Sequence, residues 1–232
     1  MSMPYYVAPE QIMKDRADYA RKGIARGRAL VALSYDKGIL LCAENPSRTL
    51  HKVAEIYDRI AFAGVGKFSE FDSLRTAGIR HADLKGYSYS REDVDSRSLA
   101  NAFAQLLGNV FTHEMKPMEV EILVAEVGWQ LEFDQIFRIS YDGTVVDEEH
   151  RTVLGGDSDA ISERLNAATA DDASIDLGAA LRGAVSALAG PDRTIPATEL
   201  EVAILDRAQT HRAFRRLTLA ELEPLLTAPA EG

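Results

Sequence analysis

The sequence has little of three features that would indicate a secreted or membrane protein. It contains one cysteine in 232 residues, so no disulfide can form within the chain. It has no apolar run that approaches the ~18–20 residues needed to cross a bilayer. Its first residues, MSMPYYVAPEQ, lack the basic stretch and apolar core of a secretory signal. Together these absences predict a cytoplasmic protein that has no membrane partner.

The sequence also lacks an excess of positive charge. Its 26 Lys and Arg against 36 Asp and Glu give a formal net charge of −10. A nucleic-acid-binding protein usually carries a basic face, so we expect no nucleic acid as a partner. One basic cluster consists of Lys14, Arg16, Arg21, Lys22, Arg26 and Arg28. It is mixed with Asp15 and Asp18, which favours a solvated helix face over a surface that meets an acidic partner.

Residues that could hold a metal or a cofactor are few and scattered. The five histidines, His51, His81, His113, His150 and His211, show no metal-ligand spacing. No serine lies in a nucleophile-elbow context. The single cysteine, Cys42, lies in the apolar run ILLCA and is predicted to be a buried core thiol. We therefore expect no metal site and no cofactor.

The first long element is a helix over 9–27, PEQIMKDRADYARKGIARG. Pro9 near its first turn and Gly27 at its end are the expected start and stop signals. The run is followed at once by a strand pair, ALVALSY and GILLCAEN, joined at Asp36-Lys37. A charged helix therefore precedes the first strand directly.

The rest of the chain alternates pairs of strands with pairs of helices. Strands are expected over 29–35, 38–44, 52–57, 60–65, 120–127, 136–141, 151–154, 199–205 and 212–217. Helices are expected over 67–83, from an N-cap at Ser96 to 111, through 161–168, over 174–188 and after Thr218. Such an order stacks two sheets face to face and covers each with helices. It predicts an α+β fold, a four-layer αββα sandwich with an extra N-terminal helix, in a single domain over 9–232 behind a short segment, 1–8.

Many stretches, in this order and spacing, resemble α-type subunits of the actinobacterial 20S proteasome, a family within the N-terminal-nucleophile hydrolase superfamily. They are YARKGIARGRALVAL, CAENPSRTLHKVAEIYDR, AGVGKFSEFDSLRTAGI, RSLANAFAQLLGNVFT, EVEILVAEVG, RISYDGTVVDE, LEVAILD and HRAFRRL. The resemblance covers nearly the whole chain. It implies the proteasome subunit fold, which agrees with the sandwich predicted from the pattern of elements.

The resemblance also indicates where a catalytic site would lie. In the β-type subunits an N-terminal threonine attacks the peptide bond, assisted by an acidic residue and a lysine. The corresponding positions in this chain are Arg28, Glu44 and Lys52. Arg28 and its neighbours offer no hydroxyl or thiol, and the helix before Arg28 does not resemble a removable segment. We expect no catalytic residue here; the alternative is an active threonine-type hydrolase subunit with unrecognised processing.

Two other functional regions are implied by the resemblance. Lys52 and Gly66 match residues that line an activator-docking pocket, where a lysine receives a C-terminal carboxylate. Without the resemblance, Lys52 would be interpreted as a surface lysine at a strand start. The gate at the ring axis corresponds to the first eight residues, Met1, Ser2, Met3, Pro4, Tyr5, Tyr6, Val7 and Ala8. Their alternative interpretation is a frayed terminus.

The resemblance implies a non-catalytic subunit that forms the outer heptameric rings of a core particle, gates substrate entry and docks activators. The implied partners are β-type subunits, other copies of the chain, an AAA ATPase or other activator ring, and unfolded proteins in transit. The remaining alternative is a stand-alone binding protein that uses the same fold.

Overall fold

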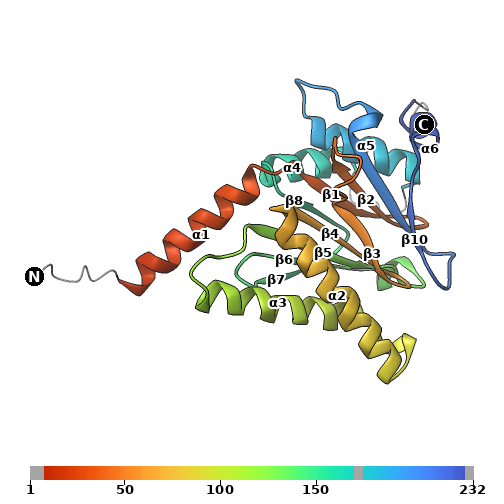
Figure 1. The fold of residues 1–232 in the computed structure, drawn as a ribbon. Coiled ribbons are helices and arrows are strands. Elements are labelled where there is room, and N and C mark those ends of the chain that lie inside the picture. The colour runs from red at the N-terminus through yellow and green to blue at the C-terminus, as the bar shows by residue number, and fades with distance from the viewer. Residues whose placement is uncertain (1–7, 170–174, 228–232) are drawn as a thin grey trace, which may run out of the picture.

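The fold consists of six helices and two five-stranded sheets within residues 8–169 and 175–227, the part of the chain that the computed structural model describes (Figure 1). The helices are α1 (Pro9–Ala25), α2 (Phe68–Ser88), α3 (Ser96–His113), α4 (Ser158–Ala168), α5 (Leu177–Ala189) and α6 (Leu219–Thr227). The strands are β1 (Leu30–Tyr35), β2 (Gly38–Glu44), β3 (Val53–Tyr57), β4 (Ile60–Gly66), β5 (Val120–Glu126), β6 (Gln135–Ile139), β7 (Val145–Glu148), β8 (Arg151–Leu154), β9 (Leu200–Asp206) and β10 (Phe214–Arg216).

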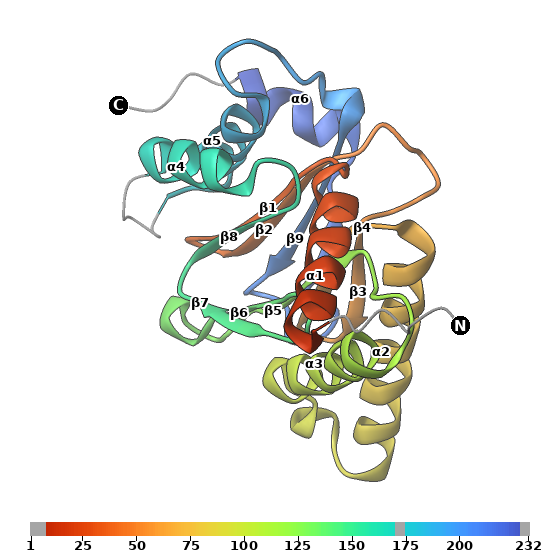
Figure 2. The ribbon, with the colours of Figure 1, turned by 90° about the vertical axis from the view of Figure 1, so that its left-hand side faces the viewer.

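The two sheets are antiparallel throughout and lie face to face. The first has the strand order β10-β9-β2-β1-β8, and the second has the order β3-β4-β5-β6-β7. Helices α4, α5 and α6 cover the outer face of the first sheet, while α2 and α3 cover that of the second (Figures 1 and 2). The predicted αββα sandwich is therefore confirmed.

Three apolar cores hold these layers together. Alternate residues of β1 show the pattern: Leu30 and Ala32 enter the core between the sheets, whereas Val31 and Leu33 pack beneath α4 and α5. A strand buried on both faces needs a continuous apolar run, which explains the composition of β1 and β2. Cys42 belongs to the second of these cores and is fully buried, as predicted.

Helix α1 extends away from the body of the molecule (Figure 1). Pro9 occupies its first turn, and only Ala20 and Ile24 are buried. The residues over 9–15 are all exposed. Among the basic residues of this helix, Arg21 is exposed and pairs with Asp18 at 3.3 Å, as expected of a solvated helix face.

Several boundaries differ from the sequence-based expectation. The unpredicted strand is β7, which carries two acidic residues and is only partly buried, so it has little apolar alternation. Helix α1 ends at Ala25 instead of Gly27, and α2 continues to Ser88, five residues beyond the expected end. The N-cap of α3 is Asp95, whose carboxylate accepts from Ser98 N at 2.7 Å; Ser96 is inside the helix and donates to Gln135.

Candidate functional site

Lys52 lies immediately before β3, at the end of the loop that connects β2 to the second sheet. Its Nζ donates a hydrogen bond of 2.6 Å to the backbone carbonyl of Arg28, just beyond the end of α1. Burial lowers the pKa of the Lys52 amine to about 8, while the carboxylates of Glu201 and Glu44 act in the opposite direction. The lysine is therefore a partly buried, readily neutralised cation and not an ordinary surface lysine.

Gly66 ends β4 and lies beside the same turn of the chain. Its φ of +104° belongs to the region that favours glycine, and a Cβ there would be 2.0 Å from the carbonyl oxygen of Glu119. A Cβ on Gly27 would lie 3.3 Å from the backbone nitrogen of Gly66. The two residues predicted to line one pocket, Lys52 and Gly66, are thus both adjacent to the Gly27-Arg28 dipeptide.

Arg28 and Glu44 form an ion pair where the sequence comparison with catalytic subunits expects a nucleophile and its acid. Glu44 is 3% exposed and also accepts two hydrogen bonds from Arg193, at 2.9 and 2.7 Å. The Arg193 hydrogen bonds, assisted by charge attraction from Arg28, lower the pKa of the Glu44 carboxyl. Glu44 is therefore an ionised carboxylate paired with two arginines, and not a free general base.

A cavity of about 570 Å³ opens beside this cluster. Its lining includes Arg28, Glu44, Arg164 and Arg193, together with backbone of the Gly190-Pro191 turn. The cavity is open to solvent and its lining is mixed, with Ile161 and Leu188 beside the charged groups. Residue 28 supplies no hydroxyl or thiol. The three arginines of this lining can bind an anionic group.

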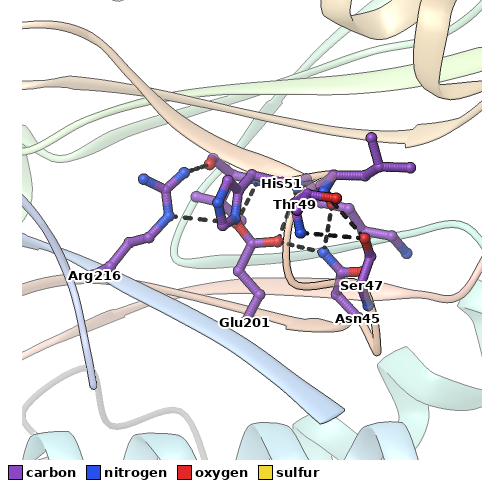
Figure 3. A network of polar contacts seen from close by, with 9 residues as sticks. Asn45, Ser47, Thr49, His51, Glu201 and Arg216 are labelled. Atoms are coloured by element: carbon purple, nitrogen blue, oxygen red, sulfur yellow. Dashed lines mark hydrogen bonds and ion pairs between the residues drawn. The ribbon is translucent and has the colours of Figure 1, made fainter. Parts of the chain in front are cut away.

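The loop that leads to Lys52 is held by a polar network centred on Glu201 of β9 (Figure 3). The Glu201 carboxylate accepts from Asn45 Nδ2 at 2.7 Å and from Lys52 N at 2.8 Å. The loop has internal bonds too, since Asn45 donates to Leu50 O and Ser47 Oγ accepts from Leu50 N. The irregular loop over 45–52 is thereby bonded to Glu201 at both of its ends.

Comparison with known proteins decides the family. The sequence profile of the proteasome subunit family matches residues 24–204. The chain is 62% identical over 232 residues to the proteasome subunit alpha of Acidimicrobium ferrooxidans, covering 100% of this chain and 99% of the relative. It is 57% identical to that of Sanguibacter keddieii over 239 residues, with 99% and 91% covered. The match to that of Thermomonospora curvata is 54% over 234 residues, covering both chains fully.

This chain belongs to the proteasome subunit family. Its full-length similarity to alpha subunits of actinobacteria makes it an α-type member, which is a component of a complex with other proteasome subunits. The resemblance inferred from the sequence is confirmed. In this α-type subunit, the structure brings together Arg28, Glu44, Lys52 and Gly66, although 38 positions of sequence separate the first of them from the last.

Of the predicted gate of this proteasome subunit, only Ala8 can be placed. Ala8 is exposed and precedes the first turn of α1, where its carbonyl accepts from Gln11 N at 2.9 Å. The residues over 1–7 lie outside the described part of the chain. Within the described ranges, no group of three or more His, Cys, Asp or Glu could hold a metal ion. In those same ranges, no helix is long and apolar enough to cross a membrane.

The sequence analysis missed Glu201, Asn45 and Arg193. Each lies about 150 residues from its partner in the site, so no local spacing relates them. A signal did exist for Glu201, which is the buried one of the two carboxylates in the strand LEVAILD; the other, Asp206, ends the strand. A charge in a strand buried on both faces requires partners, and that requirement could have directed attention to it.

Proposed function

We propose that this α-type subunit is non-catalytic and acts in assembly, gating and activator docking. The observation that carries the proposal is the Arg28–Glu44 ion pair, at the positions where the resemblance to β-type subunits leads us to expect a nucleophile and its acid. In the chain described here, Arg28 follows helix α1 and a short turn, so its nitrogen is part of a peptide bond. Without hydroxyl, thiol or terminal amine, the threonine-type mechanism has no reacting group.

Assembly is the second part of the proposal. The subunit forms the outer heptameric rings of a 20S core particle, and β-type subunits form the inner ones. Rings of identical copies use heterologous contacts that close on themselves. The exposed residues 9–15 of α1 support this proposal, because a helix that stands away from its own fold leaves side chains for a neighbouring copy.

Docking of an ATPase or other activator ring is placed at Lys52 and Gly66. A lysine ammonium is suited to the C-terminal carboxylate of an activator chain, and partial burial strengthens such a contact. Gly66 contributes its backbone conformation beside the turn at Gly27, because the space that a Cβ would occupy is filled by the carbonyl oxygen of Glu119. The amine that would receive the carboxylate is already positioned by Arg28 O.

Gating is assigned to residues 1–8, which precede α1. Tyr5 and Tyr6 give this segment aromatic rings that can pair with copies of themselves at a ring axis. Unfolded proteins then enter the particle between these segments. The domain organisation that follows is a gate over 1–8 and a single domain over 9–232.

One experiment tests the proposal as a whole. The purified chain is studied by native mass spectrometry, alone and with a β-type partner, and both samples are assayed with fluorogenic peptides. We expect rings, no cleavage by the chain alone, and cleavage only by the α–β particle. A covalent adduct of a threonine-directed inhibitor on this chain would contradict the non-catalytic assignment. A monomer that does not associate with the partner would contradict the assembly role.

A further inference from the structure

The carboxylate of Glu201 lies in an unusual place for a charge. Glu201 is 8% exposed, and along β9 it shares a strand face with Ala203 and Leu205. Those two residues belong to the apolar core between the sheets. A carboxylate at the rim of this core has a large desolvation cost, which only specific partners offset.

The partners of Glu201 come almost entirely from the segment that ends in Lys52. One carboxylate oxygen, Oε2, accepts from Asn45 Nδ2 and from the backbone N–H of Lys52, at 2.7 and 2.8 Å. The other, Oε1, lies 3.3 Å from Val53 N and 3.2 Å from His51 Nδ1. Figure 3 shows the loop residues gathered around this single side chain.

Arg216 of β10 completes the arrangement. Its Nε lies 3.5 Å from Glu201 Oε1, and its guanidinium donates to the carbonyl of Val53. Both backbone groups of Val53 are thus bonded to side chains of the first sheet, while Val53 itself pairs with Ala63 in the second sheet. The start of β3 is therefore fixed to both sheets at once.

We propose that Glu201 is the positioning residue of the docking lysine. It binds no activator itself; it fixes the backbone of Lys52, so that Nζ is held at the end of α1 before any carboxylate arrives. A preorganised cation loses less conformational entropy on binding than a mobile one. This inference rests on the proposed docking function of Lys52, and the test below separates the two.

The first variant is Glu201→Gln, which keeps the shape but replaces one oxygen by an NH2 group. In one orientation the NH2 group would face Asn45 Nδ2 and Lys52 N, and in the other it would face Val53 N. All of these are donors, so at least one hydrogen bond to the loop is lost in either orientation. The matched control is Asp134→Asn. Asp134 is a fully buried carboxylate that accepts from Gly128 N and pairs with Arg207, so it also fixes a loop.

The control is placed at the far end of the sandwich. Asp134 directly precedes β6, at the end of the second sheet where Gln135 pairs with Glu126 and Glu126 with Ile60. Val53 pairs with Ala63, toward the opposite end of that sheet. Both variants lose one buried carboxylate, so both lower stability. Only Glu201→Gln is expected to change the surroundings of Lys52.

Two measurements on the assembled α–β particle report on Lys52 without an activator. The first is hydrogen–deuterium exchange of peptides covering 45–53, which should become roughly tenfold faster in Glu201→Gln through local opening. The second is the acetylation rate of Lys52 with sulfo-N-hydroxysuccinimide acetate, expected to change about threefold or more as the amine leaves Arg28 O. Asp134→Asn should leave both unchanged while accelerating exchange over 128–134.

A third measurement relates the result to docking. ATPase-stimulated degradation of casein should fall about fivefold or more in Glu201→Gln relative to Asp134→Asn, with peptide hydrolysis in the absence of ATPase unchanged in both. If Glu201→Gln shows the same exchange over 45–53 and the same acetylation rate of Lys52 as the wild type, the positioning role is overturned. If Lys52→Ala leaves ATPase stimulation intact, the proposed docking function of Lys52 is wrong. Exchange and acetylation in Glu201→Gln then still decide whether Glu201 positions Lys52.

A milder variant covers the case in which Glu201→Gln does not assemble. Asn45→Ala removes one donor to Glu201, one bond to Leu50 O and the oxygen that accepts from Ser47 N, and leaves the carboxylate in place. It should give intermediate exchange over 45–53. Exchange as slow as in the wild type would contradict the role of the network.

Discussion

The amine of Lys52 and the backbone carbonyl of Arg28 are joined by a hydrogen bond of 2.6 Å, across 24 positions of sequence. This bond connects the proposed docking pocket to the short segment just beyond the end of α1, the helix that follows the proposed gate. A carboxylate that binds the amine must share it with Arg28 O or displace that oxygen.

Replacing Lys52 by alanine should weaken activator docking without preventing assembly. The loss of a charge-assisted contact in a partly buried pocket is worth about 1–3 kcal/mol per site. Repeated around a ring, such losses multiply through avidity. The measurement is ATPase-stimulated degradation compared with ring assembly by native mass spectrometry. The control is Lys37→Ala, in the exposed β1–β2 turn; equal stimulation in both variants would make Lys52 a surface residue.

Docking should weaken as the pH rises through the pKa of Lys52. That pKa is lowered by burial to about 8, so the amine is charged at pH 7 and mostly neutral at pH 9. Only the charged form attracts a carboxylate, and roughly a tenth remains charged at pH 9, which corresponds to about tenfold weaker docking. The measurement is the ATPase concentration that gives half-maximal stimulation at pH 7, 8 and 9.

The matched variant for this pH dependence is Lys52→Arg, whose guanidinium stays charged throughout the range. Its docking, whatever its strength at pH 7, should not change between pH 7 and 9. The same slope in wild type and Lys52→Arg would assign the pH dependence to another group, such as one on the ATPase.

Replacing Gly66 by alanine should destabilise the subunit. The φ of +104° is strained for alanine, and the new Cβ would be 2.0 Å from Glu119 O. We expect the free energy of unfolding to fall by more than about 2 kcal/mol. The control is Gly108→Ala in α3, where a Cβ would be 3.4 Å from Asp142 O and helix propensity favours alanine by about 1 kcal/mol. Chemical denaturation that gives both variants equal stability would contradict this account.

Removing residues 1–8 should open the particle. Peptide hydrolysis by the assembled α–β particle should rise without an activator, because the proposed gate is gone. Assembly and melting temperature should stay near wild type, since Pro9 can begin a helix without a preceding backbone partner. The β-type ring alone serves as control. Unchanged hydrolysis after truncation would show that the segment does not close the entrance.

Most of the fold could be predicted from local patterns. Continuous apolar runs indicated β1 and β2, and Pro9 with Gly27 bounded α1 to within two residues. Strand β7 was missed because it is only four residues long, VVDE, with two valines followed by two acidic residues, so its sequence lacks the apolar–polar alternation that marks a strand.

The site was only partly predictable. The resemblance indicated Lys52 and Gly66, and the structure places both beside Gly27-Arg28. Glu201 binds the backbone of Lys52, and Arg216 binds that of Val53 next to it, both through tertiary contacts between the two sheets. Such contacts depend on the packing of two sheets, which no short-range spacing in the sequence encodes.

The exposure of the first turns of α1 affects when this part of the helix forms. Within residues 9–15 no side chain is buried against the subunit's own fold, and a helix of two turns is marginal in water by itself. We expect these turns to fray in a dilute monomer and to become ordered as copies associate. Helical content measured by circular dichroism should then rise with protein concentration, so that part of the secondary structure belongs to the assembly and not to the chain.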